Sequence, residues 1–330
     1  MPVHSAGGVA AEPSPEDGSV ADLGEFGMIA RITAGRRLPS ATLLGPGDDA
    51  AVLAAADGRV VACTDMLVEG MHFRLDWSTP HQAGRKAVAA NLADVAAMGA
   101  VPTGLLVALA CPGHTPAATV QAMFDGMWEE AGRVGAGVVG GDVVSAPKII
   151  ISVTALGDLQ GRAPIARSGA RPGEVLAMCG RLGWAAAGLA VLSRGFRSPM
   201  TVVGAHRVPE PPYDAGPWAA VAGATAMIDV SDGLLADLGH IAKASGVSID
   251  IDSAALTIPR RLVEVASALG ADPRHWVLTG GEDHALLASF PPRIVLPSEW
   301  TIIGAVREGR GVTVDGNPYQ GPAGWTHFTP

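Results

Sequence analysis

Acidic residues recur in this chain at the ends of apolar runs, usually beside glycine. They occur in Gly47-Asp48-Asp49, Thr64-Asp65, Asn91-Leu92-Ala93-Asp94, Gly140-Gly141-Asp142, Asp229-Val230-Ser231-Asp232-Gly233 and Gly280-Gly281-Glu282-Asp283. Mg²⁺ prefers oxygen ligands, and proteins usually hold it with a few carboxylates together with substrate phosphates. The lysine-bearing phosphate loop Gly-x-x-x-x-Gly-Lys-Ser/Thr does not accompany these segments. The pattern therefore predicts a site for several Mg²⁺ ions and a phosphate-rich substrate.

The segment Asp229–Gly233 is the strongest of these signals. An apolar run, Ala224–Ile228, is predicted to be a strand, and a helical pattern begins at Asp232. Either Ser231 or Asp232 could simply cap that helix. Asp229 would not be needed for capping, so Asp229 and Asp232 could together bind one ion or two neighbouring ions.

Each remaining acidic segment has a simpler alternative. Gly47-Asp48-Asp49 could be a solvated turn, and Asp65 could be a turn residue at the end of a strand. Gly140-Gly141-Asp142 reads as a turn that lets the backbone approach a phosphate. Asn91 and Asp94 lie on one face of a helix, where Asp94 could form a structural ion pair with Arg85 or Lys86.

Three further residues stand out singly. His72 lies shortly after Asp65, although a lone histidine more often packs or faces solvent. Arg167 could clamp a triphosphate with two parallel hydrogen bonds, or be an ordinary linker residue. Trp325 lies near the end of the chain, away from the predicted core elements.

Composition limits the class of protein. The chain has 330 residues, 48% of them hydrophobic and 17% charged, which indicates a globular protein of two domains. The net charge of -9 disfavours nucleic acid as a partner. The three cysteines are widely spaced, as expected in the reducing cytoplasm. No long apolar segment predicts a membrane span, and residues 1–20 read as a flexible leader without signal-peptide character.

Strand and helix patterns alternate, which predicts an α/β or α+β chain. The expected strands are Val60–Cys63, Gly104–Ala110, Lys148–Leu156, Val175–Met178, Ala224–Ile228, Val247–Ile251 and Ala285–Phe290. The expected helices are His81–Met98, Ala117–Val134, Trp184–Arg194, Asp232–Ala244 and Arg260–Leu269. The proline-rich segment His206–Pro217 is predicted to be irregular. We expect an N-terminal domain over residues 21–160 and a C-terminal domain over residues 161–330.

Taken in order, the segments resemble the thiamine-monophosphate kinase family. The resemblance is carried by GDDAA, CTDMLVEGMHF, NLADVAAMGA, GGD, RSGARPG, DVSDGLLADLGHI, GGEDHAL and the terminal GWTHF. It implies the two-domain α/β (α+β) fold of aminoimidazole ribonucleotide synthetase, with an N-terminal ATP-binding domain and a C-terminal α/β domain. It also implies a homodimer that binds ATP at its interface.

The resemblance implies roles for individual residues. Mg²⁺ ligands would be Asp49, Asp65, Asp94, Asp142, Asp229 and Asp232, with Cys63 and Thr64 beside them. ATP would contact Gly141, Asp142, Arg167 and Ser231, and the acceptor substrate would contact His72, Glu282 and Trp325. Asp229 and Asp232 would be the catalytic pair. The chain departs from the family at Cys63 (usually Ser), Val143-Val144 (Thr-Thr), His284-Ala285 (Tyr-Glu) and Trp325 (often Tyr).

The implied reaction transfers a phosphoryl group from ATP to thiamine monophosphate, giving thiamine diphosphate. The acceptor is already a phosphate, so the reaction needs no general base, and we expect direct transfer without a phosphoenzyme. A two-metal phosphatase could use the same carboxylates, and a non-catalytic Mg²⁺- or nucleotide-binding protein is the third alternative.

Overall fold

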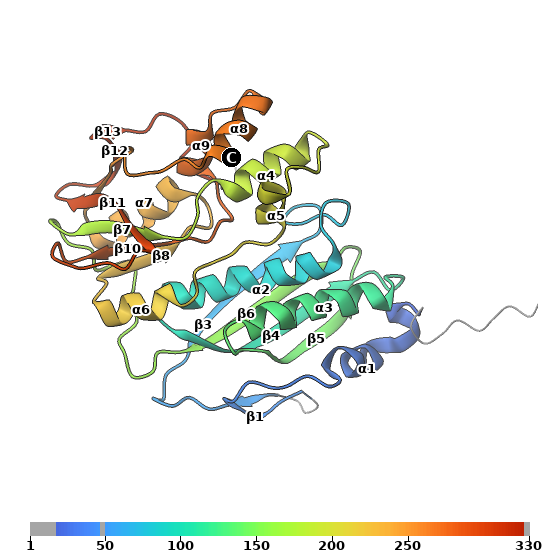
Figure 1. Cartoon of the computed structure of the whole chain (residues 1–330). Helices are drawn as coiled ribbons and strands as arrows, with labels where there is room; N and C mark the ends of the chain where they lie inside the picture. The colour runs from blue at the N-terminus through green and yellow to red at the C-terminus, as the bar shows by residue number, and fades with distance from the viewer. Residues whose placement is uncertain (1–17, 47–49, 327–330) are drawn as a thin grey trace, which may run out of the picture.

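Two large sheets, one from each half of the sequence, form the frame of the molecule (Figure 1). The structure is a computed structural model that describes residues 18–46 and 50–326. Asp49, one of the predicted metal ligands, therefore lies outside the described residues. Below, the N-terminal half means residues 18–158 and the C-terminal half means residues 159–326.

The N-terminal sheet has four strands in the order β3-β6-β4-β5. Its strands are β3 (Val61–Val68), β4 (Val101–Cys111), β5 (Val138–Ser145) and β6 (Ile150–Asp158). β6 pairs antiparallel with β3 and β4, whereas β4 and β5 run parallel. Two helices, α2 (Pro80–Ala97) and α3 (Ala117–Gly132), cover one face, and α1 (Val20–Thr33) packs beside α3 (Figure 1). The short strands β1 (Thr42–Leu44) and β2 (Val52–Leu53) form a separate pair.

The opposite face of this sheet has no helix over it in the described chain. Residues that pair directly across strands share a face, so Met66, Ser152, Ala108 and Asp142 line up on this uncovered side. Met66, Ala108 and Asp142 are exposed, and so are Leu106 and Val144 on the same face. We call this surface the open face of the N-terminal sheet.

The C-terminal sheet has seven strands in the order β13-β12-β9-β11-β7-β10-β8. Its strands are β7 (Val175–Cys179), β8 (Ala226–Asp229), β9 (Ser248–Ile251), β10 (Leu286–Phe290), β11 (Trp300–Arg307), β12 (Gly311–Val314) and β13 (Asn317–Pro318). Neighbouring strands are antiparallel except β12 and β9. Its helices are α4 (Trp184–Ser193), α5 (Met200–Arg207), α6 (Ala215–Ala222), α7 (Leu234–Ser245), α8 (Arg260–Leu269) and α9 (Pro273–Thr279).

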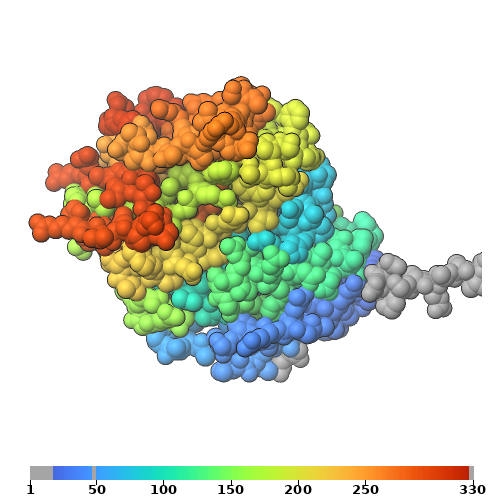
Figure 2. Space-filling view, viewed as in Figure 1, coloured from blue at the N-terminus to red at the C-terminus, as the bar shows by residue number. Residues whose placement is uncertain are grey.

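Helix α2 joins the two halves. Its Ala96 and Ala97 belong to a buried cluster with Phe290 and Trp300 of the C-terminal sheet. At Gly216 in α6, a Cβ atom would lie 1.9 Å from the carbonyl oxygen of Ala96, so only glycine permits this approach. The space-filling view shows the C-terminal half lying directly on the N-terminal half (Figure 2).

The structure confirms the mixed α/β class and differs from the sequence prediction in local detail. β3 continues past Asp65 to Val68, so Asp65 lies inside a strand and not at its end. Gly140-Gly141-Asp142 is part of β5 and not a turn. The prediction that all of His206–Pro217 is irregular was wrong, because α5 extends to Arg207 and α6 begins at Ala215. No helix among the described residues is long and apolar enough to cross a membrane.

Candidate functional site

Carboxylates from both halves of the chain meet where α2 packs against β8. Asp94 lies on α2, Asp65 on β3, and Asp229 is the last residue of β8. Burial, followed by the negative charges of Asp229 and Asp65, raises the pKa of the Asp94 carboxyl from 3.8 to about 7. These contributions place the three groups in one neighbourhood, and a bound cation would relieve their repulsion.

Asn91 fixes the position of Asp65 relative to α2. Its side-chain oxygen accepts a hydrogen bond from the Asp65 N–H at 3.0 Å, and its amide donates to the Ala87 carbonyl at 2.9 Å. The Cys63 thiol donates to the Asn91 carbonyl at 3.3 Å. Burial, helped by the charges of Asp94 and Asp65, raises the pKa of the Cys63 thiol far above its ordinary value, so the thiol stays neutral. Thr64 points the other way, toward the open face, where its hydroxyl meets that of Thr154 at 3.1 Å.

Asp229 pairs with a buried histidine, His284, and the sequence did not predict this contact. The His284 Nδ1 atom lies 2.9 Å from the Asp229 Oδ2 atom, and both side chains are buried. Burial alone would lower the pKa of His284, but the hydrogen bond and charge of Asp229 outweigh it and raise the pKa. His284 stood out only as a departure from the family pattern, and its contact with Asp229 comes from the pairing of β8 with β10.

Asp232 is not a helix cap. α7 begins at Leu234 with Gly233 as its N-cap, and no side-chain cap hydrogen bond forms there among the described residues. Instead, Asp237 Oδ2 accepts hydrogen bonds from the N–H groups of Asp232 and Gly233, each at 3.0 Å. The prediction that Ser231 or Asp232 caps the helix was therefore wrong, and the Asp232 carboxylate is not used for capping.

Two residues of α7 lie close to Asp232. Asp232, Asp237 and His240 each offer a possible metal-ligand atom, and these atoms lie within 4.8 Å of one another. Burial, then the charge of Asp229, raises the pKa of Asp237 to about 7. Sequence reasoning missed both Asp237 and His240, although their spacing of three residues on one helix was visible.

Two glycine-bearing segments pack onto the acidic turn. The backbone N–H of Glu282 donates to the Ser231 carbonyl at 2.8 Å, and the backbone N–H of Trp325 donates to the Asp232 carbonyl at 3.0 Å. A Cβ atom at Gly281 would lie 2.3 Å from the Ser231 oxygen, so a side chain there would force the two loops apart. The structure thus brings Ser231, Asp232, Glu282 and Trp325 together.

Lys86 links two of the residues predicted to contact the substrate, Glu282 and His72. The Lys86 Nζ atom lies 2.8 Å from Glu282 Oε1 and donates to the His72 carbonyl at 3.0 Å. The His72 Nδ1 atom accepts a hydrogen bond from the Val68 N–H at 3.0 Å. In a neutral ring this assigns the proton of His72 to Nε2. Lys86 is thus engaged elsewhere and is not the ion-pair partner of Asp94.

Other predicted residues are not part of this cluster. Asp65, Val153, Val107 and Gly141 form one row across β3, β6, β4 and β5. Three strand spacings separate Asp65 from Gly141, about 14 Å. Asp142 follows Gly141 and points to the open face. Arg167 is exposed, and its guanidinium forms no ion pair or hydrogen bond with the other described candidates.

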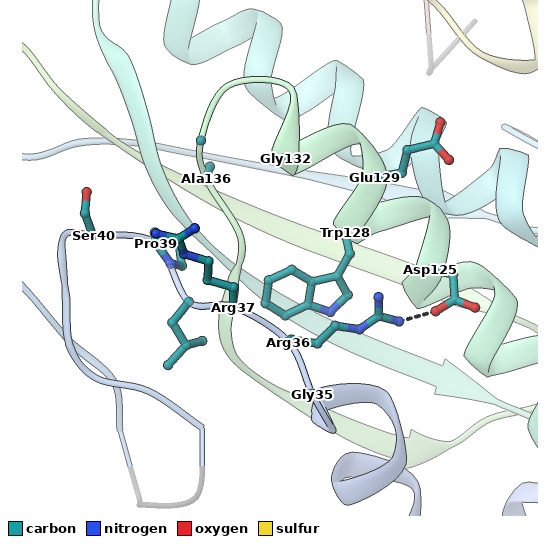
Figure 3. Close-up of a pocket in the computed structure, with 12 residues that line it drawn as sticks. Gly35, Arg36, Arg37, Pro39, Ser40, Asp125, Trp128, Glu129, Gly132 and Ala136 are labelled. Atoms are coloured by element: carbon teal, nitrogen blue, oxygen red, sulfur yellow. Dashed lines mark hydrogen bonds and ion pairs between the residues drawn. The ribbon is translucent and has the colours of Figure 1, made fainter.

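A hollow of about 700 Å³ lies elsewhere on the N-terminal half. It is formed by the loop after α1 and the C-terminal part of α3 (Figure 3). Arg36 reaches Asp125 beside the indole ring of Trp128, and Arg37 also lines the hollow (Figure 3). None of the predicted site residues lines it.

Comparison with known proteins identifies close relatives. Residues 47–159 match the family described as "AIR synthase related protein, N-terminal domain". A thiamine-monophosphate kinase of Mycobacterium tuberculosis is 56% identical over 315 residues, covering 95% of this chain and 94% of the relative. The Corynebacterium glutamicum thiamine-monophosphate kinase is 44% identical, with 94% of this chain and 95% of the relative covered. A solved structure, "AaThiL complexed with AMPPCP and TMP", has a TM-score of 0.78 and 32% identity, covering 93% of this chain and 98% of that one.

Proposed function

Since the chain belongs to the thiamine-monophosphate kinase family, we propose that it phosphorylates thiamine monophosphate with ATP to give thiamine diphosphate. One observation carries this proposal: carboxylates from both halves converge beside the residues predicted to contact the acceptor. The 56% identical relative covers nearly the whole chain, so both halves of this site lie within the similarity. The related structure with AMPPCP and TMP is consistent with an ATP-like donor and a phosphate acceptor meeting on one protein.

The chemistry requires positioning more than proton transfer. A phosphate monoester has a second pKa of about 6, so the acceptor is mostly a dianion at neutral pH. An acceptor oxygen forms its bond to the γ-phosphorus of ATP while the bond to the ADP leaving oxygen breaks. The main obstacle is repulsion between two anions, so the chain must hold both phosphates in line against that repulsion.

The donor set fits Mg²⁺. Asp65, Asp94 and Asp229 supply hard oxygen atoms, and the pKa of Asp94 is raised even though His284 lies beside Asp229, so negative charge predominates around Asp94. We propose that these residues and Asp232 would hold Mg²⁺, with Asp229 and Asp232 nearest the transferring phosphate. Bound Mg²⁺ would supply positive charge for the phosphates of both substrates.

The residues around these carboxylates form two groups, proposed contacts of thiamine monophosphate and proposed contacts of ATP. We propose that His72, Glu282 and Trp325 contact thiamine monophosphate. The exposed Trp325 indole suits the positively charged thiazolium ring. Ser231, Gly141, Asp142 and Arg167 are the proposed ATP contacts.

The position of Asp142 favours a homodimer. Asp142 lies on the open face, three strands from Asp65, so one chain does not bring these two predicted ligands to one ion. The open face also exposes Met66, Leu106 and Val144, which is an apolar surface suited to a second copy. We propose that two open faces pack together and that ATP binds at their interface. Light scattering after size exclusion tests this, and a monomer at micromolar concentration would contradict it.

We also propose a cytoplasmic location for the protein and a boundary between its two domains. Cys63, Cys111 and Cys179 are all free thiols, which suits the reducing cytoplasm. We place the domain boundary at residues 160 and 161, in the connection between β6 and β7.

The test is incubation with ATP, Mg²⁺ and thiamine monophosphate, with separation of the products by chromatography. We expect thiamine diphosphate and ADP in equal amounts, and almost no ATP consumption without the acceptor. Release of inorganic phosphate without thiamine diphosphate would instead indicate a phosphatase. Absence of any ATP turnover would indicate a binding protein.

A further inference from the structure

Lys86 is a buried cation at the contact between the two halves. Its side chain projects from α2, and the residue is 4% exposed. Its Nζ atom lies 2.8 Å from a Glu282 carboxylate oxygen in the C-terminal half and donates to the His72 carbonyl of the N-terminal half at 3.0 Å. Lys86 therefore contacts two of the three residues predicted to contact the acceptor, Glu282 and His72.

The surroundings of Glu282 leave its carboxylate little freedom. Its backbone has a φ of 65°, in the left-handed region, and its N–H is bound to the Ser231 carbonyl at 2.8 Å. Lys86 approaches one carboxylate oxygen, and the His206 Nδ1 atom lies 3.3 Å from the other. Burial alone would raise the pKa of Glu282, but the charge of Lys86 and the contact with His206 hold the pKa far below its ordinary value.

Lys86 supplies the positive charge in this group. Burial lowers the pKa of His206, which favours the neutral ring at physiological pH. A carboxylate has about four lone-pair positions, so the two contacts leave Glu282 able to accept further hydrogen bonds. Glu282 is therefore held as an anion with capacity for an N–H donor or a cationic ring.

We propose that Lys86 is a positioning residue for the acceptor substrate. Its ammonium group fixes the Glu282 carboxylate and the His72 main chain in one geometry, across the contact between the two halves. Glu282 then presents a fixed negative charge to the amino-substituted and cationic rings of thiamine monophosphate. This inference rests on the proposed function, because the acceptor is the substrate named there.

The test replaces Lys86 by Met, which keeps the length of the side chain and removes its charge. We expect Lys86→Met to raise the KM for thiamine monophosphate by about tenfold or more, as expected for loss of a charged hydrogen bond. The KM for ATP should stay within about twofold. Lys243→Met, at an exposed position on α7, is the matched control and should leave both constants unchanged. A residue that only supports the fold would lower kcat or affect both substrates alike.

A double-mutant cycle with Glu282→Gln shows whether Lys86 acts through Glu282. We expect the double variant to bind thiamine monophosphate about as weakly as Glu282→Gln alone. If the two substitutions weaken binding by factors that multiply, the residues act independently and the proposal is overturned. If Lys86→Met unfolds because the partly buried Glu282 carboxylate loses its cation, the neutral double variant and Glu282→Gln still give the comparison. In that case the double variant is expected to bind as Glu282→Gln does, and clearly weaker binding would overturn the proposal.

Calorimetric titration with thiamine monophosphate separates this proposal from the proposed function. Binding by the wild type without turnover would contradict the kinase function, and the cycle would then be measured in affinities. Failure of the wild type to bind would overturn both.

Discussion

Replacing Asp94 by Asn should stabilise the metal-free protein while abolishing its activity. In the structure, burial and the charges of Asp229 and Asp65 raise the pKa of Asp94 from 3.8 to about 7. A difference of about 3 pKa units corresponds to about 4 kcal/mol of unfavourable interaction in the ionised form. Part of this energy belongs to the neighbouring carboxylates, because coupled groups titrate together. We therefore expect Asp94→Asn to raise the free energy of unfolding by only about 1–3 kcal/mol at pH 8.

The effect should depend on pH in a defined direction. The pKa of Asp94 is higher in the folded protein than in the unfolded chain, so the folded protein binds more protons between about pH 4 and pH 7. The stability of the wild type should therefore fall as pH rises through this range. Asn does not titrate, so the advantage of the variant should be greatest above about pH 7 and disappear near pH 4.

Urea unfolding in the presence of EDTA, at pH 5 and pH 8, measures this difference. Asp214→Asn is the matched control, because Asp214 is exposed and its side chain does not cap α6. Added Mg²⁺ should stabilise the wild type by mass action and stabilise Asp94→Asn much less. Equal destabilisation by Asp94→Asn at both pH values would refute the reasoning, because it would identify Asp94 as an ordinary structural partner.

Three further substitutions probe the rest of the site. Asp232→Asn should keep its melting temperature, since Gly233 and not Asp232 occupies the N-cap, yet lose about 100-fold or more in turnover; a fully active variant would end the metal assignment there. Trp325→Ala should raise the KM for thiamine monophosphate several-fold, by loss of about 0.5–2 kcal/mol of cation–π attraction, with the KM for ATP nearly constant. Equal changes for both substrates would make Trp325 a packing residue. Cys63→Ser should retain activity within a few-fold, because a hydroxyl can also donate to the Asn91 carbonyl; complete loss would give the thiol a role of its own.

Sequence patterns predicted the elements with strong periodicity and the acidic turn that joins β8 to α7. They predicted that the strand ends at Asp65. The strand in fact continues through the exposed Met66 to Val68. They also misread Gly140-Gly141-Asp142, since glycines usually mark turns but here lie within a strand with one face open.

The partners of the candidate residues were harder to predict, because they come from distant parts of the chain. His284 reaches Asp229 through the pairing of two strands, and Lys86 reaches Glu282 through the packing of α2 on the C-terminal half. The role of Asp237 was local but ambiguous, because a carboxylate in the first turn of a helix is common. Its two backbone hydrogen bonds are visible only in the structure.

The most direct test of the account is a crystal structure of the protein with Mn²⁺ in place of Mg²⁺, an ATP analogue and thiamine monophosphate. Anomalous diffraction locates the metal ions independently of the protein atoms. We predict ions bound by carboxylate oxygens of Asp94 and Asp229 together, at about 2.0–2.2 Å, between the phosphates of the two substrates. Ions bound to residues of only one half, or no ion at these carboxylates, would contradict the claim that the two halves build one cation site for phosphoryl transfer.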